Sequence, residues 1–234
     1  LKLPEFTKDS SIKILPIVSS SKAAKLILSY WKKHYNKVAD GVIVEGPKAG
    51  GHLGFKADSL KYDIANFDDN VSNIINEIFN LEKEFNSKIP VIVGGGVFDS
   101  KDIKKYLNLG ASGVQIGTRF VATDECDAHI KFKQAYVNAS KNDIKIIKSP
   151  VGMPGRAINN NLIKRLSTEK IKFDKCYNCL IPCNPNTTPY CISKALIDAV
   201  SGDVENGLVF CGEDAYKIKK IVPVKELLFE LTKE

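Results

Sequence analysis

The feature that most constrains this chain is a pattern that recurs four times along its first 140 residues. A short apolar run is followed each time by a stretch with apolar residues at every third or fourth position. The apolar runs are Ile12 to Ser20, Gly41 to Gly46, Pro90 to Gly96 and Gly113 to Gly117. Near-continuous apolar runs of this length are typical of parallel strands that are buried on both faces. The chain is therefore predicted to be an α/β protein.

The predicted helices follow these strands in order. Lys22 to Tyr35 and Val71 to Phe85 have apolar residues at helical spacing, and a third helix begins at Asp99 or Ser100, either of which can cap it. Polar and helical sequence then extends from Thr118 to Ser140. The turns from strand to helix carry the Gly, His and Ser residues. In a closed barrel these turns form the active face, and in an open sheet they form a crevice at the strand ends.

The sequence beyond Ser140 is less regular, and we divide the chain into residues 1–150 and 151–234. The expected elements are a further strand in Ile144 to Gly152, a break in regular structure at Met153 to Arg156, a loop at Cys176 to Pro189, a helix at Tyr190 to Val200 ended by Ser201 and Gly202, and a closing helical region at Gly212 to Glu234 that contains Pro223.

Composition excludes several classes of protein. The 234 residues are 44% hydrophobic and 26% charged, which is usual for a globular protein, and no apolar run approaches the roughly 20 residues that span a bilayer. The net charge of +7 comes from lysines scattered over amphipathic segments rather than gathered with arginines and aromatics into a stripe. We therefore expect neither a membrane nor a nucleic acid as a partner.

The first residues of the chain bear on where the protein is located in the cell. It opens Leu-Lys-Leu-Pro, without an initiator Met or a signal peptide, so we expect a cytoplasmic protein whose gene begins upstream of Leu1. The six cysteines are then better interpreted as reduced thiols or metal ligands than as a disulfide framework.

A glycine-rich loop, Glu45 to Gly54, follows the second apolar run and contains the main catalytic candidate. Gly50 and Gly51 let the backbone come close to a flat ligand. His52 follows them, and an imidazole at a strand end can act as an acid or a base near neutral pH. His34 and His129 lie in lysine-rich helical surroundings, where a structural role is expected.

Two further turns have the composition of a phosphate site. Gly94, Gly95 and Gly96 end the third strand just before a capped helix, where side-chain-free amides and a helix N-terminus attract phosphate. The next strand ends in Gln115, Gly117 and Thr118, and two consecutive turns of this kind are typical of the phosphate site of barrel enzymes. Neither a P-loop nor a GxGxxG dinucleotide motif is present.

The cysteine-rich loop leaves two alternatives open. The spacing of Cys176, Cys179, Cys183 and Cys191 suits four thiolates around zinc or an iron–sulfur cluster, and it equally suits a set of reduced, partly buried thiols. We therefore assign no metal ligand from sequence. Cys126 and Cys211 lie outside this spacing and are expected to be packing residues.

Four segments together carry a family resemblance: EGPKAGGHLG, PVIVGGGV, GVQIGTRFVATDEC and SPVGMPGRAI. They resemble the nitronate monooxygenases, formerly called 2-nitropropane dioxygenases, which are related to FMN-dependent enoyl-acyl carrier protein reductases. The resemblance implies a TIM barrel with one FMN that oxidises alkyl nitronates with molecular oxygen. It implies that His52 is the catalytic base beside the flavin, that Gly94, Gly95 and Gly96 bind its phosphate, and that Gln115, Gly117 and Thr118 form the second phosphate-binding turn.

The resemblance also implies that much of a barrel lies outside this chain. The four predicted strands match the last four of the family, so we expect about the C-terminal half of a (β/α)8 barrel followed by a Cys-rich extension. Half a barrel exposes two sheet edges, so we expect weak FMN binding by the chain alone and a homo-oligomer as one way to cover the edges.

Three other functions remain open from sequence. The first is an enoyl-acyl carrier protein reductase that uses NAD(P)H, with an enoyl thioester in place of a nitronate. The second is a non-catalytic flavin-binding fragment. The third is a barrel that acts on a phosphorylated metabolite, such as an inosinate dehydrogenase, although none of the six cysteines lies in the two glycine-rich loops where its nucleophile is expected.

Overall fold

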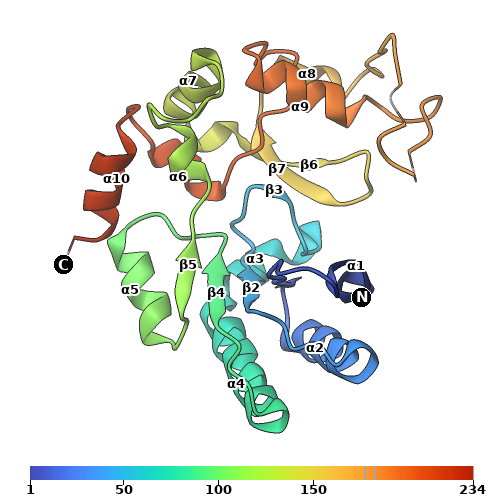
Figure 1. The fold of residues 1–234 in the computed structure, drawn as a ribbon. Helices are drawn as coiled ribbons and strands as arrows, with labels where there is room; N and C mark the ends of the chain where they lie inside the picture. The colour runs from blue at the N-terminus through green and yellow to red at the C-terminus, as the bar shows by residue number, and fades with distance from the viewer. Residues whose placement is uncertain (177, 182, 234) are drawn as a thin grey trace. The chain divides into compact units, whose positions relative to one another are not determined.

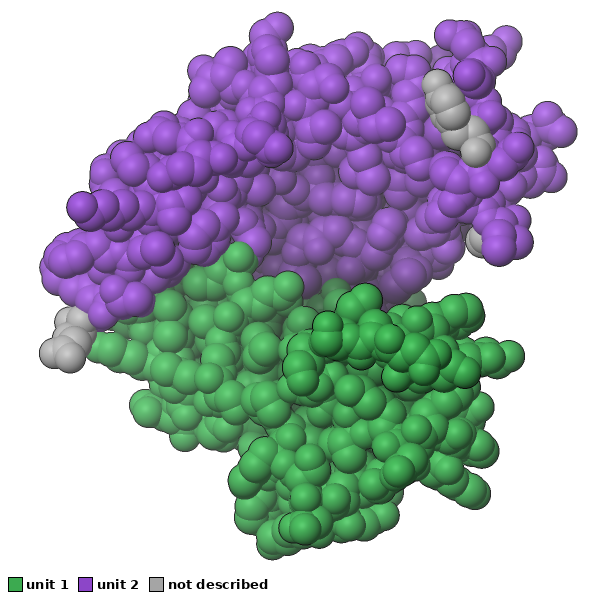
Figure 2. Space-filling model, viewed as in Figure 1, with its two compact units in different colours: residues 1–47, 58–116 green, residues 48–57, 117–234 purple. Residues whose placement is uncertain are grey.

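The computed structural model describes residues 1–176, 178–181 and 183–233 of the chain (Figure 1). The chain forms two compact units, which Figure 2 shows in different colours: unit 1 comprises Leu1–Pro47 and Asp58–Ile116, and unit 2 comprises Lys48–Ala57 and Gly117–Glu234. This division differs from the expected boundary at residue 150. Residues 48–57 and 117–150 belong to unit 2 because they pair and pack with the C-terminal part of the chain.

Unit 1 contains the predicted parallel sheet. Its strands are β1 (Ile17–Val18), β2 (Val42–Glu45), β4 (Val91–Gly94) and β5 (Gly113–Gln115), in the order β1-β2-β4-β5, and every pair is parallel. Each strand thus lies beside the strand of the next strand-helix repeat, as in a (β/α)8 barrel. The α/β prediction is confirmed.

Helices connect and cover these strands. They are α1 (Leu3–Thr7), α2 (Ser21–Tyr35), the 3₁₀ turn η1 (Ala57–Ser59), α3 (Leu60–Ala65), α4 (Phe67–Phe85) and α5 (Ser100–Asn108). The Ser20 hydroxyl accepts the Ala23 amide and caps α2. Helix α4 begins four residues before the predicted Val71, because Phe67 is buried and packs with the core. His34 lies on α2 and stacks on Tyr30, in agreement with a structural role.

The core of unit 1 lies between the sheet and the helices. Val44 and Val93 are completely buried together with Leu28 of α2 and Ile74 of α4. The residues that alternate with the buried ones are more accessible, and Ile17 in β1 is 60% exposed. The strands are therefore buried well on one face only, whereas the apolar runs predicted burial on both.

The first predicted strand is much shorter than its apolar run. Only Ile17 and Val18 pair with β2, although the run extends from Ile12. Pro16 precedes the paired residues and has no amide hydrogen to donate. Ile14 is nevertheless buried, and its amide donates to the Asp40 carboxylate at 3.0 Å rather than to a neighbouring strand.

Unit 2 contains a second sheet that the sequence did not predict in full. Strands β3 (Gly51–His52), β7 (Pro154–Ile158) and β6 (Ile144–Lys148) form an antiparallel sheet in the order β3-β7-β6. The expected break at Met153 to Arg156 is therefore wrong. Gly152, at φ +85°, makes the turn between β6 and β7, and Pro154 occupies the first position of its strand, where proline is tolerated.

The helices of unit 2 lie in the predicted segments, except for those at Lys141–Asp143 and Asn161–Arg165, which the sequence did not predict. They are α6 (Thr118–Val121), α7 (Ile130–Asn138), η2 (Lys141–Asp143), α8 (Asn161–Arg165), α9 (Ile192–Val200), η3 (Glu213–Lys217) and α10 (Val224–Leu231). Gly202, at φ +103°, follows the end of α9 as expected, and His129 caps α7 by accepting the Lys131 amide. Among the described residues, no helix combines the length and apolarity that crossing a membrane requires.

Asp40 gives a testable prediction for unit 1. Burial alone raises the pKa of its carboxyl, but the Ile14 amide, Lys37 and Lys13 more than compensate and lower the pKa to about 2. A carboxyl whose pKa is lower in the folded protein stabilises it above pH ~4, and this stabilisation is lost as the pH falls toward 2. We expect Asp40→Asn to lower the free energy of unfolding by about 1.5 kcal/mol at pH 7.

Urea denaturation of the full-length protein at pH 7, 4 and 2.5 measures this effect, with Asp9→Asn, at an exposed position, as the control. The difference between the wild type and Asp40→Asn should shrink as the pH falls. A difference that does not change with pH contradicts the electrostatic role of Asp40.

Candidate functional site

His52 is held by backbone pairing in unit 2. It lies on β3, opposite Gly155 of β7, and the Leu53 amide donates to the Pro154 carbonyl at 2.9 Å. Gly51, immediately before it, has φ +79°, a conformation that side-chain-bearing residues rarely adopt. The glycine-rich loop is thus not a free turn: its second half forms a strand that fixes the position of the imidazole.

The imidazole of His52 has two defined neighbours. Its Nε2 lies 2.7 Å from the hydroxyl of Ser149, a residue that is 3% exposed. The ring of Phe210 meets the His52 ring edge-on, with 5.1 Å between centroids. Burial lowers the pKa of His52 from its usual value, so the imidazole is neutral at pH 7. A neutral, oriented imidazole is the form that can accept a proton.

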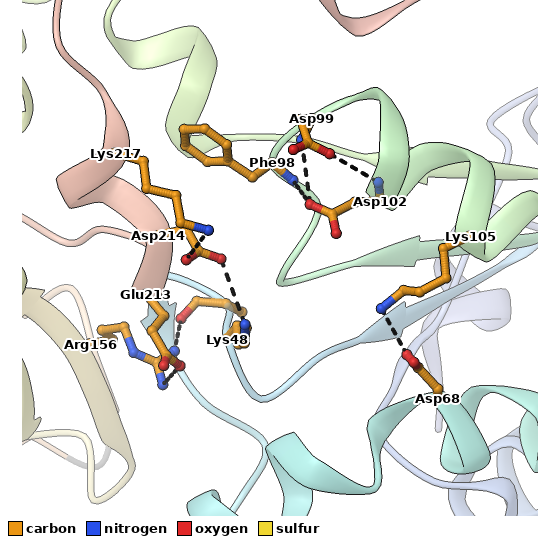
Figure 3. Close-up of polar contacts among 11 residues, drawn as sticks. Lys48, Asp68, Phe98, Asp99, Asp102, Lys105, Arg156, Glu213, Asp214 and Lys217 are labelled. Atoms are coloured by element: carbon orange, nitrogen blue, oxygen red, sulfur yellow. Dashed lines mark hydrogen bonds and ion pairs between the residues drawn. The ribbon is translucent and has the colours of Figure 1, made fainter. Parts of the chain in front are cut away.

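A buried arginine anchors the loop that precedes His52 (Figure 3). The Arg156 guanidinium donates to the Ala49 carbonyl at 2.5 Å and forms an ion pair with Glu213 at 3.4 Å. Arg156 is only 3% exposed, and burial lowers the pKa of its guanidinium, which nevertheless remains protonated because arginine is not deprotonated in proteins. The buried guanidinium of Arg156 thus connects the glycine-rich loop, through the Ala49 carbonyl, with η3, through Glu213.

A second set of contacts joins the same two segments. The Glu213 amide donates to the Lys48 carbonyl at 3.0 Å, and Asp214 lies 3.8 Å from the Lys48 ammonium and 2.8 Å from that of Lys217 (Figure 3). Gly50 packs so closely here that a Cβ would lie 2.6 Å from the Cys211 carbonyl carbon. Gly50 is therefore required for packing, independently of any ligand.

Cys211 and Thr118 lie beside this loop. Cys211 is 2% exposed, and burial raises the pKa of its thiol to about 12, so it is a protonated packing residue rather than a nucleophile. The Thr118 hydroxyl accepts the Gly212 amide at 2.9 Å and keeps its own hydrogen for donation. A Cβ at Gly117 would meet nothing within 4 Å, which leaves room for a ligand near this turn.

The glycine turn Gly94 to Gly96 lies in unit 1, at the carboxyl end of β4. Gly95 and Gly96 have φ of +77° and +129°, which only glycine adopts readily. The Gly94 carbonyl accepts the Gly46 amide at 2.8 Å, and a Cβ at Gly94 would come within 3.3 Å of Gln115 at the end of β5. The ends of β4 and β5 are thus brought together, as a two-turn phosphate site requires.

The helix that follows this turn is already capped by its own carboxylates (Figure 3). Asp99 accepts the amides of Lys101 and Asp102, and the Asp102 carboxylate accepts the Phe98 amide at 2.8 Å. Lys105 of the same helix forms an ion pair with Asp68 at 2.9 Å. Any phosphate at this end of unit 1 would therefore bind the amides of the glycine turn rather than the N-terminus of α5.

The four cysteines of the C-terminal loop line a single cavity of about 210 Å³ in unit 2. Cys176 and Cys179 are exposed, and Cys183 and Cys191 are partly buried. Across residues 1–176, 178–181 and 183–233, no three His, Cys, Asp or Glu side chains are placed to hold a metal ion as they stand.

The predicted site residues are distributed over both units. Gly94, Gly95, Gly96 and Gln115 belong to unit 1, whereas Gly50, Gly51, His52, Gly117 and Thr118 belong to unit 2. Four residues that contact His52 or its loop were not predicted from sequence: Ser149, Arg156, Phe210 and Glu213. The first two lie in the SPVGMPGRAI segment, whose resemblance to a family motif was the signal that could have identified them.

The chain is an α/β protein of the barrel type. Its parallel sheet has glycine turns at the strand ends, and a histidine lies on a glycine-rich loop. Comparison with known proteins gives the family. The model of the nitronate monooxygenase family matches residues 4–234, and the chain therefore belongs to that family.

Relatives of known sequence support the assignment over part of their length. A probable nitronate monooxygenase of Staphylococcus aureus is 30% identical over 129 residues, which cover 55% of this chain and 34% of that protein. The (3aS,4S,5R,7aS)-5-hydroxy-7a-methyl-1-oxo-octahydro-1H-indene-4-carboxyl-CoA dehydrogenase of Rhodococcus jostii is 28% identical over 159 residues, which cover 68% of this chain and 38% of that protein.

Solved structures match nearly the whole chain. FabK from Thermotoga maritima, at 28% identity, aligns with a TM-score of 0.72 over 99% of this chain and 63% of its own. The nitroalkane oxidase of Streptomyces ansochromogenes, at 20% identity, has a TM-score of 0.69 over 97% of this chain and 58% of its own, and shows the shared fold. Both are TIM-barrel proteins, so the barrel prediction is confirmed, and this chain spans less than two thirds of either.

The contacts of Arg156 are expected to contribute strongly to stability. Arg156→Ala removes a buried charge from between the Ala49 carbonyl and Glu213 and leaves both without their partner. Breaking such a contact costs about 3 kcal/mol. We expect a loss of this size in the free energy of unfolding, measured by urea denaturation of the full-length protein, together with faster amide hydrogen exchange in residues 48–54.

Arg165→Ala is the matched control, because Arg165 forms an exposed ion pair with Glu169, four residues further along the chain. Exposed pairs of this kind contribute less than about 1 kcal/mol. Equal losses for the two variants contradict the anchoring role of Arg156.

Proposed function

We propose that this chain belongs to an FMN-dependent oxidoreductase that oxidises alkyl nitronates with molecular oxygen, and that His52 is its catalytic base. The observation that carries the proposal is the state of His52: its imidazole is kept neutral by burial and oriented by Ser149 at 2.7 Å, in the loop that resembles the catalytic loop of the family. The sequence relative in Staphylococcus aureus, a probable nitronate monooxygenase, supports the choice of substrate.

The described residues suit a flavin with a terminal phosphate. Gly95 and Gly96 have left-handed backbones without side chains, which leaves their amides open to a phosphate, and Thr118 offers a hydroxyl hydrogen. We propose that FMN is the flavin, that Gly94, Gly95, Gly96, Gln115, Gly117 and Thr118 bind its phosphate, and that Gly50 and Gly51 contact it through the backbone. When bound, FMN supplies the electron-accepting chemistry that side chains lack.

The role of His52 follows from its hydrogen bond. In the tautomer whose Nε2 hydrogen is donated to the Ser149 hydroxyl, Nδ1 carries the lone pair. Nδ1 would then take a proton from the carbon beside the nitro group of a nitroalkane, and the resulting imidazolium would stay bonded to Ser149. A substrate that arrives already as a nitronate has lost that proton, and His52 would only hold it in place.

A second candidate function is supported by a different observation. FabK from Thermotoga maritima aligns with 99% of this chain, including the C-terminal extension, whereas the curated nitronate monooxygenase matches cover 55%. The Rhodococcus jostii relative is a dehydrogenase of a CoA ester. The alternative is therefore a flavin-dependent reductase of enoyl thioesters that takes its electrons from NAD(P)H, with His52 as the proton donor.

One anaerobic experiment separates the two functions. The full-length protein, loaded with FMN, is mixed with propyl-2-nitronate, NADH or NADPH, and the loss of flavin absorbance is followed. The proposal predicts rapid bleaching by the nitronate and slow bleaching by both nicotinamides. Rapid bleaching by NADH or NADPH alone supports the thioester reductase and contradicts the nitronate oxidase.

His52→Ala tests the catalytic base. We expect kcat/KM for a neutral nitroalkane to fall by about 10²- to 10⁴-fold, the usual contribution of a general base, and kcat/KM for the preformed nitronate to fall much less. His129→Ala is the control, because His129 caps α7 and should leave both activities near the wild-type value. Full turnover of both substrates by His52→Ala contradicts the role of His52 as the catalytic base.

The pH dependence of the reaction follows from the pKa of His52. Because burial lowers this pKa, the neutral base persists to lower pH than in a free histidine, and the acid limb of kcat/KM for a nitroalkane should lie below about 6.5. The limb should disappear in His52→Ala. A limb above pH 7 in the wild type contradicts the assignment.

A further inference from the structure

We propose that Cys176, Cys179, Cys183 and Cys191 form a thiolate metal site in unit 2, which binds zinc or an iron–sulfur cluster. The two alternatives share one chemistry, a thiophilic metal held by up to four cysteine sulfurs. This site would be additional to the flavin chemistry proposed above and does not depend on it.

The first observation is that these four cysteines line the same cavity. Its lining includes all four, while Cys126 and Cys211, the remaining two of the chain, are not among its residues. The cavity volume of about 210 Å³ is several times the roughly 30 Å³ that one water molecule occupies in the liquid. None of the four forms a disulfide. The thiols are therefore gathered in one place, reduced and accessible to an incoming metal.

The second observation concerns the turn between Cys176 and Cys179. The amide of Asn178 donates to the Cys176 sulfur at 3.4 Å, and Asn178 has a left-handed backbone at φ +50°. The Cys176 thiol in turn donates to the Asn178 side-chain oxygen at 3.6 Å. Donors to sulfur tune thiolate metal centres. The turn between Cys176 and Cys179 therefore places an amide donor on one of the four sulfurs.

The third observation links Cys179 to Cys191. The Cys179 sulfur lies 3.0 Å from the hydroxyl of Ser193, in the first turn of α9. Cys191 is the residue that begins this helix, and its side chain accepts no capping hydrogen bond from the described backbone. Two of the four cysteines therefore meet at one helix end, although they are twelve positions apart in sequence.

A buried tyrosine lies in the wall of the cavity. Tyr190 is 2% exposed and lines it, and its hydroxyl interacts with the side chain of Ser149, the partner of His52. The wall of the cavity is therefore in contact with the residue that orients His52.

The cysteines lie in a long segment whose described residues form no regular secondary structure, and a bound metal would cross-link this segment. Between the end of α8 at Arg165 and the start of α9 at Ile192, the described residues form no helix or strand. Structureless segments of this length inside a folded unit are uncommon unless they are functional. Residues 164–175, which lead into the cavity, contain five basic and two acidic side chains, a charge that would offset the net negative charge of a tetrathiolate centre.

Metal binding would complete an arrangement that is only partly formed. No three described side chains are yet placed to hold an ion, so the sulfurs would have to draw together to the ~2.3 Å of a zinc–sulfur bond. Each thiol that ligates would release its proton, so the affinity should rise with pH. Pro150 and Val151, which follow the His52 partner Ser149, line the same cavity and would be fixed as it closes.

The test is the metal content of the full-length protein, purified anaerobically from cells grown with added iron and zinc. Iron and zinc are measured by mass spectrometry, acid-labile sulfide by colorimetry, and reactive thiols with and without a chelator. We expect about one zinc ion per chain, or iron and sulfide in equal amounts with broad visible absorption. In either case four thiols should become reactive only after the metal is removed.

Variants locate the site. Cys176→Ser combined with Cys179→Ser should lose most of the metal, and Cys126→Ser should keep it, with circular dichroism to report whether each variant is folded. The wild-type measurement stands even if the double variant fails to fold. The proposal is overturned if wild-type protein contains less than about 0.1 metal per chain and binds no added zinc at about 10 μM, far above the dissociation constants of structural zinc sites. It is also overturned if the folded double variant retains the full metal content.

Discussion

The buried guanidinium of Arg156 is the contact on which the candidate catalytic residue depends. It stands in β7, pairs through its backbone with Gly51, and reaches through its side chain to the Ala49 carbonyl and to Glu213. Burying a charge is unfavourable unless it is well paired, so the loop and η3 must stay in place to satisfy it. The same loop then carries His52 into contact with Ser149. Fixing the imidazole is thus a consequence of satisfying one buried cation.

The sequence was sufficient for the parallel sheet and insufficient for the antiparallel one. Residues 42–45 and 91–94 were predictable because their apolar runs pair locally with the next strand-helix repeat. Gly51 and His52 could not be predicted as a strand, since their partner, β7, is about 100 residues away and begins with Pro154, which locally indicates a break. Long-range pairing has no local signature in a single sequence.

The site shows the same division. His52 and the glycines could be proposed from sequence, because glycine turns after apolar runs have a direct physical meaning. The partners of His52 could not, because Ser149 and Phe210 reach it through the tertiary fold. The capping of α5 by Asp99 and Asp102 also qualifies the sequence argument, since it removes the helix N-terminus as an anion site and leaves the turn of Gly94 to Gly96.

The C-terminal extension is more than a tail in this account. It supplies Phe210 and Glu213 to the surroundings of His52, and its cysteine-lined cavity begins one residue after Ser149. Family membership alone does not explain four thiols and a left-handed Asn178 in one cavity. Their position suggests that the extension stabilises the strand pair that orients the base.

The central claim is that the glycine turns serve a flavin mononucleotide, and the most direct measurement is the cofactor content of the full-length protein. The protein is purified, denatured, and the released flavin is identified by chromatography and quantified by absorbance. We expect close to one FMN per chain, and little after replacement of both Gly95 and Gly96 by alanine. Full-length protein that releases no flavin and binds none on titration with FMN would contradict it.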